Sequence, residues 1–362
     1  MIYELYRNGV KFDCASSREI DECLSFCGIG HAVTKDILYA NPVKSLNDMM
    51  YAKNLKIAET VVDSPEEVWR IVHSGWRPSI FIRLAVEDAA SRSPFSIKFG
   101  AERRQWQAIL NILSLTGLEF AGLSFHIGSA SSDPQQYRKA IETCREFSAT
   151  TGRAVEAVDI GGGFMPETFA ETAKVIRQAK KDWEKFALRP PTRWLAEPGR
   201  FFSAPTHTLY TQIIGAKEGP GGVGWRYTID ESIYGQFSCI PFDHQRPYWK
   251  LMEHAAKASG DKMRRGITPG FIFGRTCDSL DLIAYSHRMT RMSVGDWLCF
   301  PGMGAYTMSS ASEFNGFPKP KVYCQTDGWV DPGSIPRDKD VIFPVETKSS
   351  IKLSTMDSWS KI

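Results

Sequence analysis

The stretch Ala157-Val-Asp-Ile-Gly-Gly-Gly-Phe164 joins a short apolar run to three consecutive glycines, and a helix is predicted from about Glu167. Because Gly161, Gly162 and Gly163 have no Cβ, their backbone N–H groups can close on an anion, and a helix N-terminus adds a favourable dipole. We interpret the stretch as a phosphate cradle at the C-terminal end of a strand. A tight turn between a strand and a helix would explain the same glycines, so the rest of the chain must distinguish the two.

Outward from this stretch, the chain repeats one pattern, in which a strand is followed by a helix. Seven strands are predicted, at about 10–14, 37–40, 59–62, 79–86, 118–125, 155–160 and 193–196. Helix signals follow them, such as the N-cap Ser64 with Pro65 and the apolar stripe Trp106, Ile109, Leu110 and Leu113. Charged residues or glycines gather just past the strand ends. This alternation predicts an α/β architecture of the (β/α)₈ TIM-barrel type, with ligand chemistry at the strand C-termini.

The predicted barrel has seven strand–helix units, which is one fewer than the eight of a closed barrel. Taken literally, the missing first unit would precede residue 10. After about residue 205 the pattern becomes β-rich, with predicted strands at 207–215, 225–230, 297–300 and 321–324. We therefore expect an incomplete barrel over 1–205, a β-sheet domain over 206–335 and a polar C-terminal tail over 336–362.

Composition sets broad limits on the class of protein. The 362 residues are 43% hydrophobic and 23% charged, with a net charge of +3, which gives no reason to expect nucleic acid or membrane partners. No signal peptide is recognisable at the N-terminus. The eight cysteines are scattered without a C-x-x-C pair, and Cys23 and Cys27 share one helix face, where they are expected to be core residues. A reducing, cytoplasmic setting fits best.

Several residues at strand ends could carry chemistry, and each also has a plain structural explanation. Glu197 and Arg200 flank Pro198-Gly199 and could pair with each other, or could serve a ligand that has both a cation and a phosphate. His126, followed by Gly128 and Ser129, offers an imidazole and a small donor loop. Tyr306 lies in a glycine-containing segment that could equally be a hairpin.

The β-rich part adds a thiol and three carboxylates. Cys277 and Asp278 are adjacent in Gly274-Arg-Thr-Cys-Asp-Ser-Leu-Asp281, and Asp243 lies between two prolines. Each could be ordinary loop chemistry. No spacing of His, Cys and Asp matches a zinc site, so we expect no metal.

Taken together, these segments resemble the eukaryotic-type ornithine decarboxylases, which are fold-type III pyridoxal-phosphate enzymes. Eight matching motifs occur in the family's order between residue 10 and about residue 330. They are Phe12-Asp-Cys-Ala-Ser16, Tyr39-Ala-Asn-Pro42, Ser124-Phe-His-Ile-Gly-Ser129, Asp159-Ile-Gly-Gly-Gly-Phe164, Ala196-Glu-Pro-Gly-Arg-Phe-Phe202, Thr276-Cys-Asp-Ser-Leu-Asp281, Met303-Gly-Ala-Tyr-Thr307 and Phe314-Asn-Gly-Phe317.

The resemblance implies a role for each candidate, with pyridoxal 5′-phosphate as the cofactor. Glu197 would pair with the protonated pyridine nitrogen, and His126 would stack on the ring. Asp13 would lie near the Schiff base. The phosphate would be held by Gly161, Gly162, Gly163, Ser129, Arg200 and Tyr306. Cys277 would protonate the substrate carbon after decarboxylation.

The resemblance also implies a substrate and partners. Asp243 and Asp278 would bind the distal amino group of a basic amino acid, which favours ornithine over arginine or diaminopimelate and putrescine as the product. Cys277, Asp278 and Asp243 would come from the other subunit of a homodimer. An antizyme-like regulator is a further expected partner.

Two departures from the family pattern bear on activity. The family has an arginine where Pro94 stands here, and Arg92 could substitute for it. The Schiff-base lysine of the family lies in an aromatic-Ala-Val-Lys strand about twenty residues before the Asp13 position, by resemblance, and this sequence begins after that point. Lys11 shares a strand face with Asp13 and could reach inward, although a variable strand residue is the plainer explanation.

Three hypotheses remain open at this point. The first is an ornithine decarboxylase whose upstream coding sequence carries the missing motif. The second is a non-enzymatic paralogue that binds partners in the manner of antizyme inhibitors. The third is a decarboxylase of a related basic amino acid in secondary metabolism.

Overall fold

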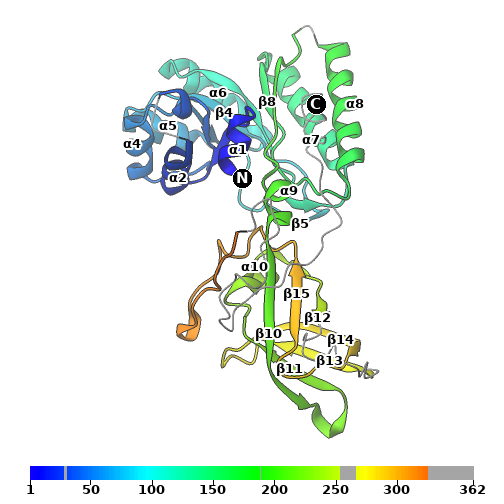
Figure 1. Ribbon diagram of the computed structural model, residues 1–362. Helices are drawn as coiled ribbons and strands as arrows, with labels where there is room; N and C mark the ends of the chain where they lie inside the picture. The colour runs from blue at the N-terminus through cyan, green and yellow to red at the C-terminus, as the bar shows by residue number, and fades with distance from the viewer. Residues whose placement is uncertain (28–30, 188, 253–265, 325–362) are drawn as a thin grey trace. The chain divides into compact units, whose positions relative to one another are not determined.

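The chain folds into two compact units, which divide between Pro198 and Gly199. The computed structural model describes residues 1–27, 31–187, 189–252 and 266–324 (Figure 1). The first unit alternates strands with helices, whereas the second consists mostly of strands. The tail expected over 336–362 lies outside the described residues.

Seven parallel strands form the sheet of the first unit, in the order β1-β2-β3-β4-β6-β8-β9. All seven strands expected from the sequence are confirmed, although most are shorter at their ends. Among the described residues, the outermost strands β1 and β9 do not pair with each other, so the sheet is an open, incomplete barrel. The strands are β1 (Phe12–Cys14), β2 (Ile37–Tyr39), β3 (Glu59–Val62), β4 (Ser79–Arg83), β6 (Phe120–Ser124), β8 (Ala157–Asp159) and β9 (Arg193–Leu195).

Helices connect these strands, and their ends follow from local sequence signals. Before α5, the Ser64 hydroxyl accepts a hydrogen bond from the Glu67 N–H at 3.3 Å, Pro65 occupies the first turn, and Gly75 ends the helix with φ 72°. The first nine residues, expected only as a fragment, contain the short helix α1. The helices are α1 (Ile2–Arg7), α2 (Ser17–Cys27), α3 (His31–Thr34), α4 (Leu46–Asn54), α5 (Pro65–Ser74), α6 (Arg103–Thr116), α7 (Gln135–Thr151) and α8 (Phe169–Phe186).

Two apolar layers hold the first unit together. The expected stripe of α6 is fully buried, with Trp106 and Ile109 at its centre. Inside the curve of the sheet, one apolar residue from each of four strands packs into a small cluster, formed by Leu38, Val61, Phe81 and Ala157. Because inward-facing side chains fill this interior, polar side chains that serve a ligand are confined to the strand ends.

The second unit contains a six-stranded sheet with the order β12-β15-β10-β11-β13-β14. All of its pairings are antiparallel except the parallel pair β11–β13. Its core is a single apolar cluster that includes Ile213, Phe237 and Phe300. Its elements include α9 (Gly199–Ser203), β10 (Thr208–Glu218), β11 (Trp225–Ile229), α10 (Cys239–Asp243), β12 (Lys250–Met252), β13 (Ile267–Phe273), β14 (Leu282–Thr290) and β15 (Trp297–Pro301).

The sequence-based expectation for this unit was right in part. The strands near 207–215, 225–230 and 297–300 are present as β10, β11 and β15. The expected strand at 321–324 is wrong, because this segment pairs with no strand among the described residues and exposes Val322 and Tyr323. The paired strands β13 and β14 were missed, since Pro269 and Gly270 gave β13 the appearance of a loop.

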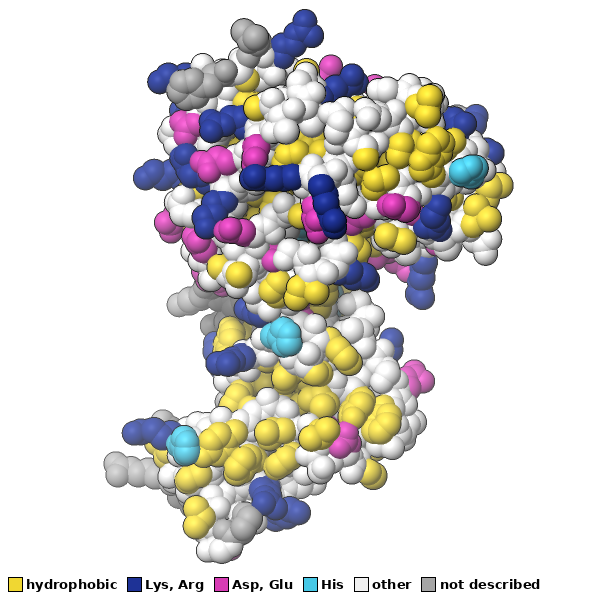
Figure 2. All heavy atoms as spheres, turned by 180° about the vertical axis from the view of Figure 1, so that it is seen from behind, with side chains coloured by type: hydrophobic (Ala, Val, Ile, Leu, Met, Phe, Trp, Pro, Cys, Tyr) yellow, Lys and Arg dark blue, Asp and Glu magenta, His cyan; other side chains and the backbone are white. Residues whose placement is uncertain are grey.

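Some apolar side chains are exposed on the surface of the molecule. Figure 2 shows them gathered over the β-rich unit, and the exposed residues there include Ile267, Leu282 and Tyr285 on β13 and β14. In the part of the chain that the structure describes, no helix is long and apolar enough to cross a membrane.

Candidate functional site

The three glycines follow β8 and press closely against their neighbours. A Cβ on Gly161 would lie 2.3 Å from the Phe125 carbonyl oxygen, and one on Gly162 would lie 2.8 Å from the Glu197 carbonyl oxygen. Gly161 and Gly163 also have φ of 64° and 99°, which other residues rarely adopt. Glycine is therefore required here for close backbone approach. Helix α8 begins at Phe169, slightly later than expected.

The backbone of this segment offers donors to an anion. The Gly161 N–H is used internally, because it donates to Asp159 Oδ1 at 2.9 Å. Within the described residues, the N–H groups of Gly162 and Gly163 have no acceptor, and Gly162 is buried. Buried N–H groups are rarely left unpaired in proteins. This unpaired donor set fits the phosphate of pyridoxal phosphate.

His126 lies just past the end of β6, beside the glycines. Its Nδ1 accepts a hydrogen bond from the Gly128 N–H at 2.9 Å, which leaves the proton of the neutral ring on Nε2. Burial, followed by the charge of Arg83, lowers the pKa of His126 to about 3. The Phe95 ring packs against it with a centroid distance of 4.8 Å. His126 is therefore a neutral, oriented plane, as ring stacking requires.

Three carboxylates meet at the C-terminal edge of the sheet. Asp13 comes from β1, Asp159 from β8, and Glu197 follows β9. Reduced hydration raises the pKa of Asp13 to about 7 and that of Glu197 well above its usual range, and mutual repulsion adds to both effects. Asp159 Oδ2 is buried and has no partner within the described residues. The three acids outnumber the nearby guanidinium of Arg83, so the cluster fits a cationic ring nitrogen.

Arg83 is the site residue that the sequence analysis missed. It ends β4, its guanidinium stacks on the Phe99 ring at 4.8 Å, and its charge lowers the pKa of both Asp13 and Glu197. Arg83 falls inside the strand predicted at about 79–86, so no strand-end signal marked it in the sequence. Arg92, the residue proposed to stand in at Pro94, lies on the exposed side of a short ladder between β5 (Ser91–Ser93) and β7 (Ser129–Ser131). Ser129 is buried in this ladder.

Lys11 does not reach inward. Its ammonium pairs with Asp36 at 2.8 Å, and its side chain is largely exposed. The structure therefore supports the plainer explanation of a surface strand residue.

In the second unit, Arg200 and Asp243 form a buried ion pair. Arg200 Nη2 lies 2.6 and 2.8 Å from the two carboxylate oxygens of Asp243, and its guanidinium packs over the Tyr306 ring at 4.6 Å. Gln245 donates to Asp243 Oδ2 at 2.7 Å. Three residues assigned to phosphate or substrate by resemblance are thus neighbours of one another.

The loop after β13 carries Cys277 and Asp278. The buried carboxylate of Asp281 shapes this loop by accepting the Thr276 N–H at 3.1 Å and the Thr276 hydroxyl at 2.6 Å. Tyr234 donates its hydroxyl proton to Asp278, and the Leu280 N–H donates to Asp278 Oδ1 at 2.9 Å. These hydrogen bonds, the Leu280 one first, lower the pKa of Asp278, so its carboxylate is ionised. Cys277 is exposed.

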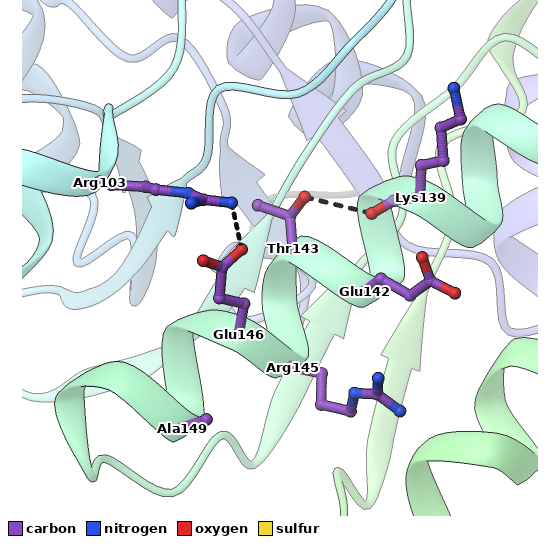
Figure 3. A pocket seen from close by; sticks show the side chains of 7 residues that line it. All are labelled: Arg103, Lys139, Glu142, Thr143, Arg145, Glu146 and Ala149. Carbon is purple, nitrogen blue, oxygen red and sulfur yellow. Dashed lines mark hydrogen bonds and ion pairs between the residues drawn. The ribbon is translucent and has the colours of Figure 1, made fainter.

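The surface hollow along α7 is a separate feature. It measures about 490 Å³ and is lined mostly by charged side chains, of which Arg103 pairs with Glu146 at 2.5 Å (Figure 3). None of the residues selected from the sequence lines it. Among the described residues, no group of three His, Cys, Asp or Glu side chains is arranged to hold a metal ion.

Comparison with known proteins shows which class of enzyme this chain resembles. Residues 1–204 match the family described as pyridoxal-dependent decarboxylase, pyridoxal binding domain. The fold resembles that of the Paramecium bursaria Chlorella virus arginine decarboxylase bound to agmatine, with a TM-score of 0.77, 29% identity and coverage of 87% of this chain and 83% of that one. A lysine/ornithine decarboxylase from Vibrio vulnificus, complexed with cadaverine, gives a TM-score of 0.73 at 29% identity, covering 88% and 82%.

Two similar sequences belong to one group of these decarboxylases. Ornithine decarboxylase of Schizosaccharomyces pombe is 34% identical over 89% of this chain and 74% of its own length. That of Caenorhabditis elegans is 35% identical over 86% and 75%. The chain therefore belongs to the ornithine decarboxylase family of fold-type III pyridoxal-phosphate-dependent decarboxylases, which act on basic amino acids, and its cofactor is pyridoxal phosphate.

Proposed function

We propose that the protein decarboxylates L-ornithine and releases putrescine, as a step of polyamine synthesis in the cytoplasm. The carboxylate cluster of Asp13, Asp159 and Glu197 beside the unpaired glycine N–H groups carries the proposal, because it matches a cofactor with a cationic ring and an anionic phosphate. When bound, pyridoxal phosphate supplies an electron sink for the pair left by the departing carboxylate.

The residues of the first unit bind and orient the cofactor in this proposal. Glu197 would pair with the protonated ring nitrogen of the cofactor, and Asp13 would lie near its reactive end. The neutral ring of His126 would pack on the cofactor ring. The backbone of Gly161 to Gly163 would hold the phosphate together with Ser129. By resemblance, Arg200 and Tyr306 of the second unit are assigned to the same phosphate. Arg83 partly offsets the repulsion among the acids, since its charge opposes the rise in the pKa of Asp13 and Glu197.

The second unit would select the substrate and return the proton. Asp278 is ionised and fixed by Tyr234, so it is the better placed of the two acids to bind a distal ammonium. Both carboxylate oxygens of Asp243 contact Arg200, so Asp243 would bind the distal ammonium only while it also pairs with Arg200. The Cys277 thiol would deliver a proton from Sγ to the substrate carbon, and its N–H is held by Asn315 Oδ1 at 3.2 Å.

A related basic amino acid is the second candidate substrate. The solved relatives are described with agmatine and with cadaverine, which shows that this fold accepts amines longer than putrescine. The chain could serve such a substrate through the same Asp278, because one carboxylate recognises any distal cation.

A substrate panel tests the proposal. We expect CO₂ release from carboxyl-labelled ornithine, in the presence of pyridoxal phosphate, with kcat/KM at least about tenfold above those for lysine, arginine and diaminopimelate. Asp278→Asn should raise KM for ornithine by about 10- to 100-fold, since the distal ammonium of the substrate loses its counter-charge, whereas the exposed neighbour substitution Ser279→Ala should not. Preference for lysine or arginine would favour the second candidate. Absence of CO₂ release from all four amino acids would contradict decarboxylation and favour the partner-binding paralogue.

A further inference from the structure

Two cysteines lie sulfur to sulfur beside the acid cluster. Cys14 is the last residue of β1 and directly follows Asp13, while Cys23 lies in the middle of α2, which packs against that strand. Their Sγ atoms are 3.8 Å apart, and both thiols are buried. A disulfide bond measures about 2.05 Å, so the sulfurs need to approach by less than about 2 Å, which draws the end of β1 toward α2 in addition to turning the two side chains.

The two thiols differ in acidity, and this difference indicates which of them an oxidant reaches first. The hydrogen bond from Cys14 lowers the pKa of Cys23, whereas the same hydrogen bond, together with burial, raises the pKa of Cys14. Cys23 is also the more accessible, at 8% exposed against 1% for Cys14. A small oxidant would therefore react first with Cys23, because the thiolate is the nucleophile.

We propose that Cys14 and Cys23 are a redox modification site, which closes to a reversible disulfide under peroxide and weakens cofactor binding. Hydrogen peroxide oxidises the Cys23 sulfur to a sulfenic acid, and its second oxygen leaves as water. The Cys14 sulfur then attacks the Cys23 sulfur, the S–S bond forms and the S–O bond breaks, which releases a second water. The two thiols lose two electrons and two protons, and the peroxide gains them.

The effect on the cofactor follows from the position of Cys14. Its carbonyl oxygen accepts the Ala40 N–H at 2.9 Å, and its neighbour Asp13 interacts electrostatically with Asp159 and Glu197. Drawing Cys14 toward α2 moves the end of β1 away from the other two acids. The oxidised protein should therefore bind pyridoxal phosphate severalfold more weakly than the reduced protein.

The modification can be tested on the full chain. The protein is treated with peroxide, its free thiols are blocked, and it is digested under non-reducing conditions. Mass spectrometry should find a linked peptide pair containing Cys14 and Cys23, lighter by about two hydrogens and split by dithiothreitol. The pair should persist in Cys27→Ser, one helical turn away, and vanish in Cys23→Ser. A Cys23–Cys27 link, or no link when the exposed Cys277 is already oxidised, would overturn it.

Titration of pyridoxal phosphate into the two forms tests the consequence separately. We expect weaker binding after oxidation of wild type and Cys27→Ser, restored by dithiothreitol, and no change in Cys23→Ser. Equal affinities for the linked and unlinked protein would overturn the coupling to the cofactor.

Discussion

At the scale of single residues, charge balance governs the site. The Asp13 side chain reaches solvent, but protein atoms surround its carboxylate and reduce its hydration. The carboxylate interacts with Asp159 and Glu197, and Arg83 is the main opposing charge. Its pKa of about 7 means that the folded chain without cofactor holds a proton that the unfolded chain, with an ordinary Asp pKa near 3.9, has already lost at neutral pH.

This proton gives the first prediction. Between about pH 4 and pH 7 the folded state binds more protons than the unfolded state at Asp13, so its contribution to stability is complete at low pH and falls as the pH rises through that window. Asp13→Asn removes the effect. We expect its melting temperature to exceed that of wild type by about 1–3 °C at pH 8 and not at pH 4.5, by calorimetry without cofactor. A constant difference between the two proteins across the pH range would show that Asp13 does not titrate there.

Sequence reasoning could select candidate residues one by one but could not predict which of them pair. Glycines, prolines and strand-end charges are visible in a sequence because they act locally, so Gly161, His126 and Glu197 could be selected. The partner of Arg200 could not, because Asp243 is distant in the chain and charges of opposite sign occur throughout. Arg83 was missed for a similar reason, since only its approach to Asp13 and Glu197 marks it.

At the scale of elements, a buried cation joins the ends of β2 and β3 to α5. Lys44, in the loop after β2, is completely buried, and its ammonium donates to the Asn41 carbonyl at 2.7 Å and the Val61 carbonyl at 2.9 Å. Its counter-ion is the buried Glu67, which also pairs with Arg70 at 2.6 Å. Burial lowers the pKa of Lys44 to about 8. The strand ends that present the site depend on this arrangement.

Replacing this lysine gives the second prediction. Lys44→Met fills a similar volume but leaves two carbonyl oxygens and part of the Glu67 charge unsatisfied, so we expect a loss of about 2–4 kcal/mol in the free energy of unfolding. The matched control is Lys139→Met, whose exposed pair with Glu87 should cost less than about 1 kcal/mol. Both values come from urea denaturation, and equal losses in the two variants would contradict the proposed role of Lys44.

Element prediction succeeded where patterns were regular. The parallel strands and amphipathic helices of the first unit repeat a strong periodic signal, and even the number of strands could be predicted. In the second unit, β13 pairs in parallel with β11 and antiparallel with β14. Such pairings join distant segments and tolerate Pro269 at one strand, so composition alone suggested a loop.

At the scale of the whole molecule, the proposed function calls for two copies of the chain. By resemblance, Cys277 and Asp278 act in the site of the partner subunit, and Glu197 acts in its own. The exposed apolar side chains of the second unit, such as Leu280 at 75% and Phe242 at 74% exposed, are consistent with a surface that a second copy covers.

The third prediction concerns this assembly. Sedimentation velocity should give a dimer, and two inactive variants, Cys277→Ala and Glu197→Ala, should regain activity when they are mixed, because one of the mixed sites then carries neither substitution. A monomer at micromolar concentration, or no gain on mixing two folded variants, would contradict shared sites.

The central claim is that pyridoxal phosphate is held where the glycine segment meets His126 and Glu197. The most direct measurement is the dissociation constant of pyridoxal phosphate for Gly162→Ala, beside wild type and the control Gly266→Ala. A methyl group at residue 162 would lie 2.8 Å from the Glu197 carbonyl oxygen and 2.9 Å from His126 Nε2, whereas one at residue 266 meets none of the described residues within 4 Å. We predict that Gly162→Ala weakens binding at least about tenfold, or 1.4 kcal/mol, while Gly266→Ala leaves it unchanged. Equal binding by folded Gly162→Ala and wild type would contradict the claim.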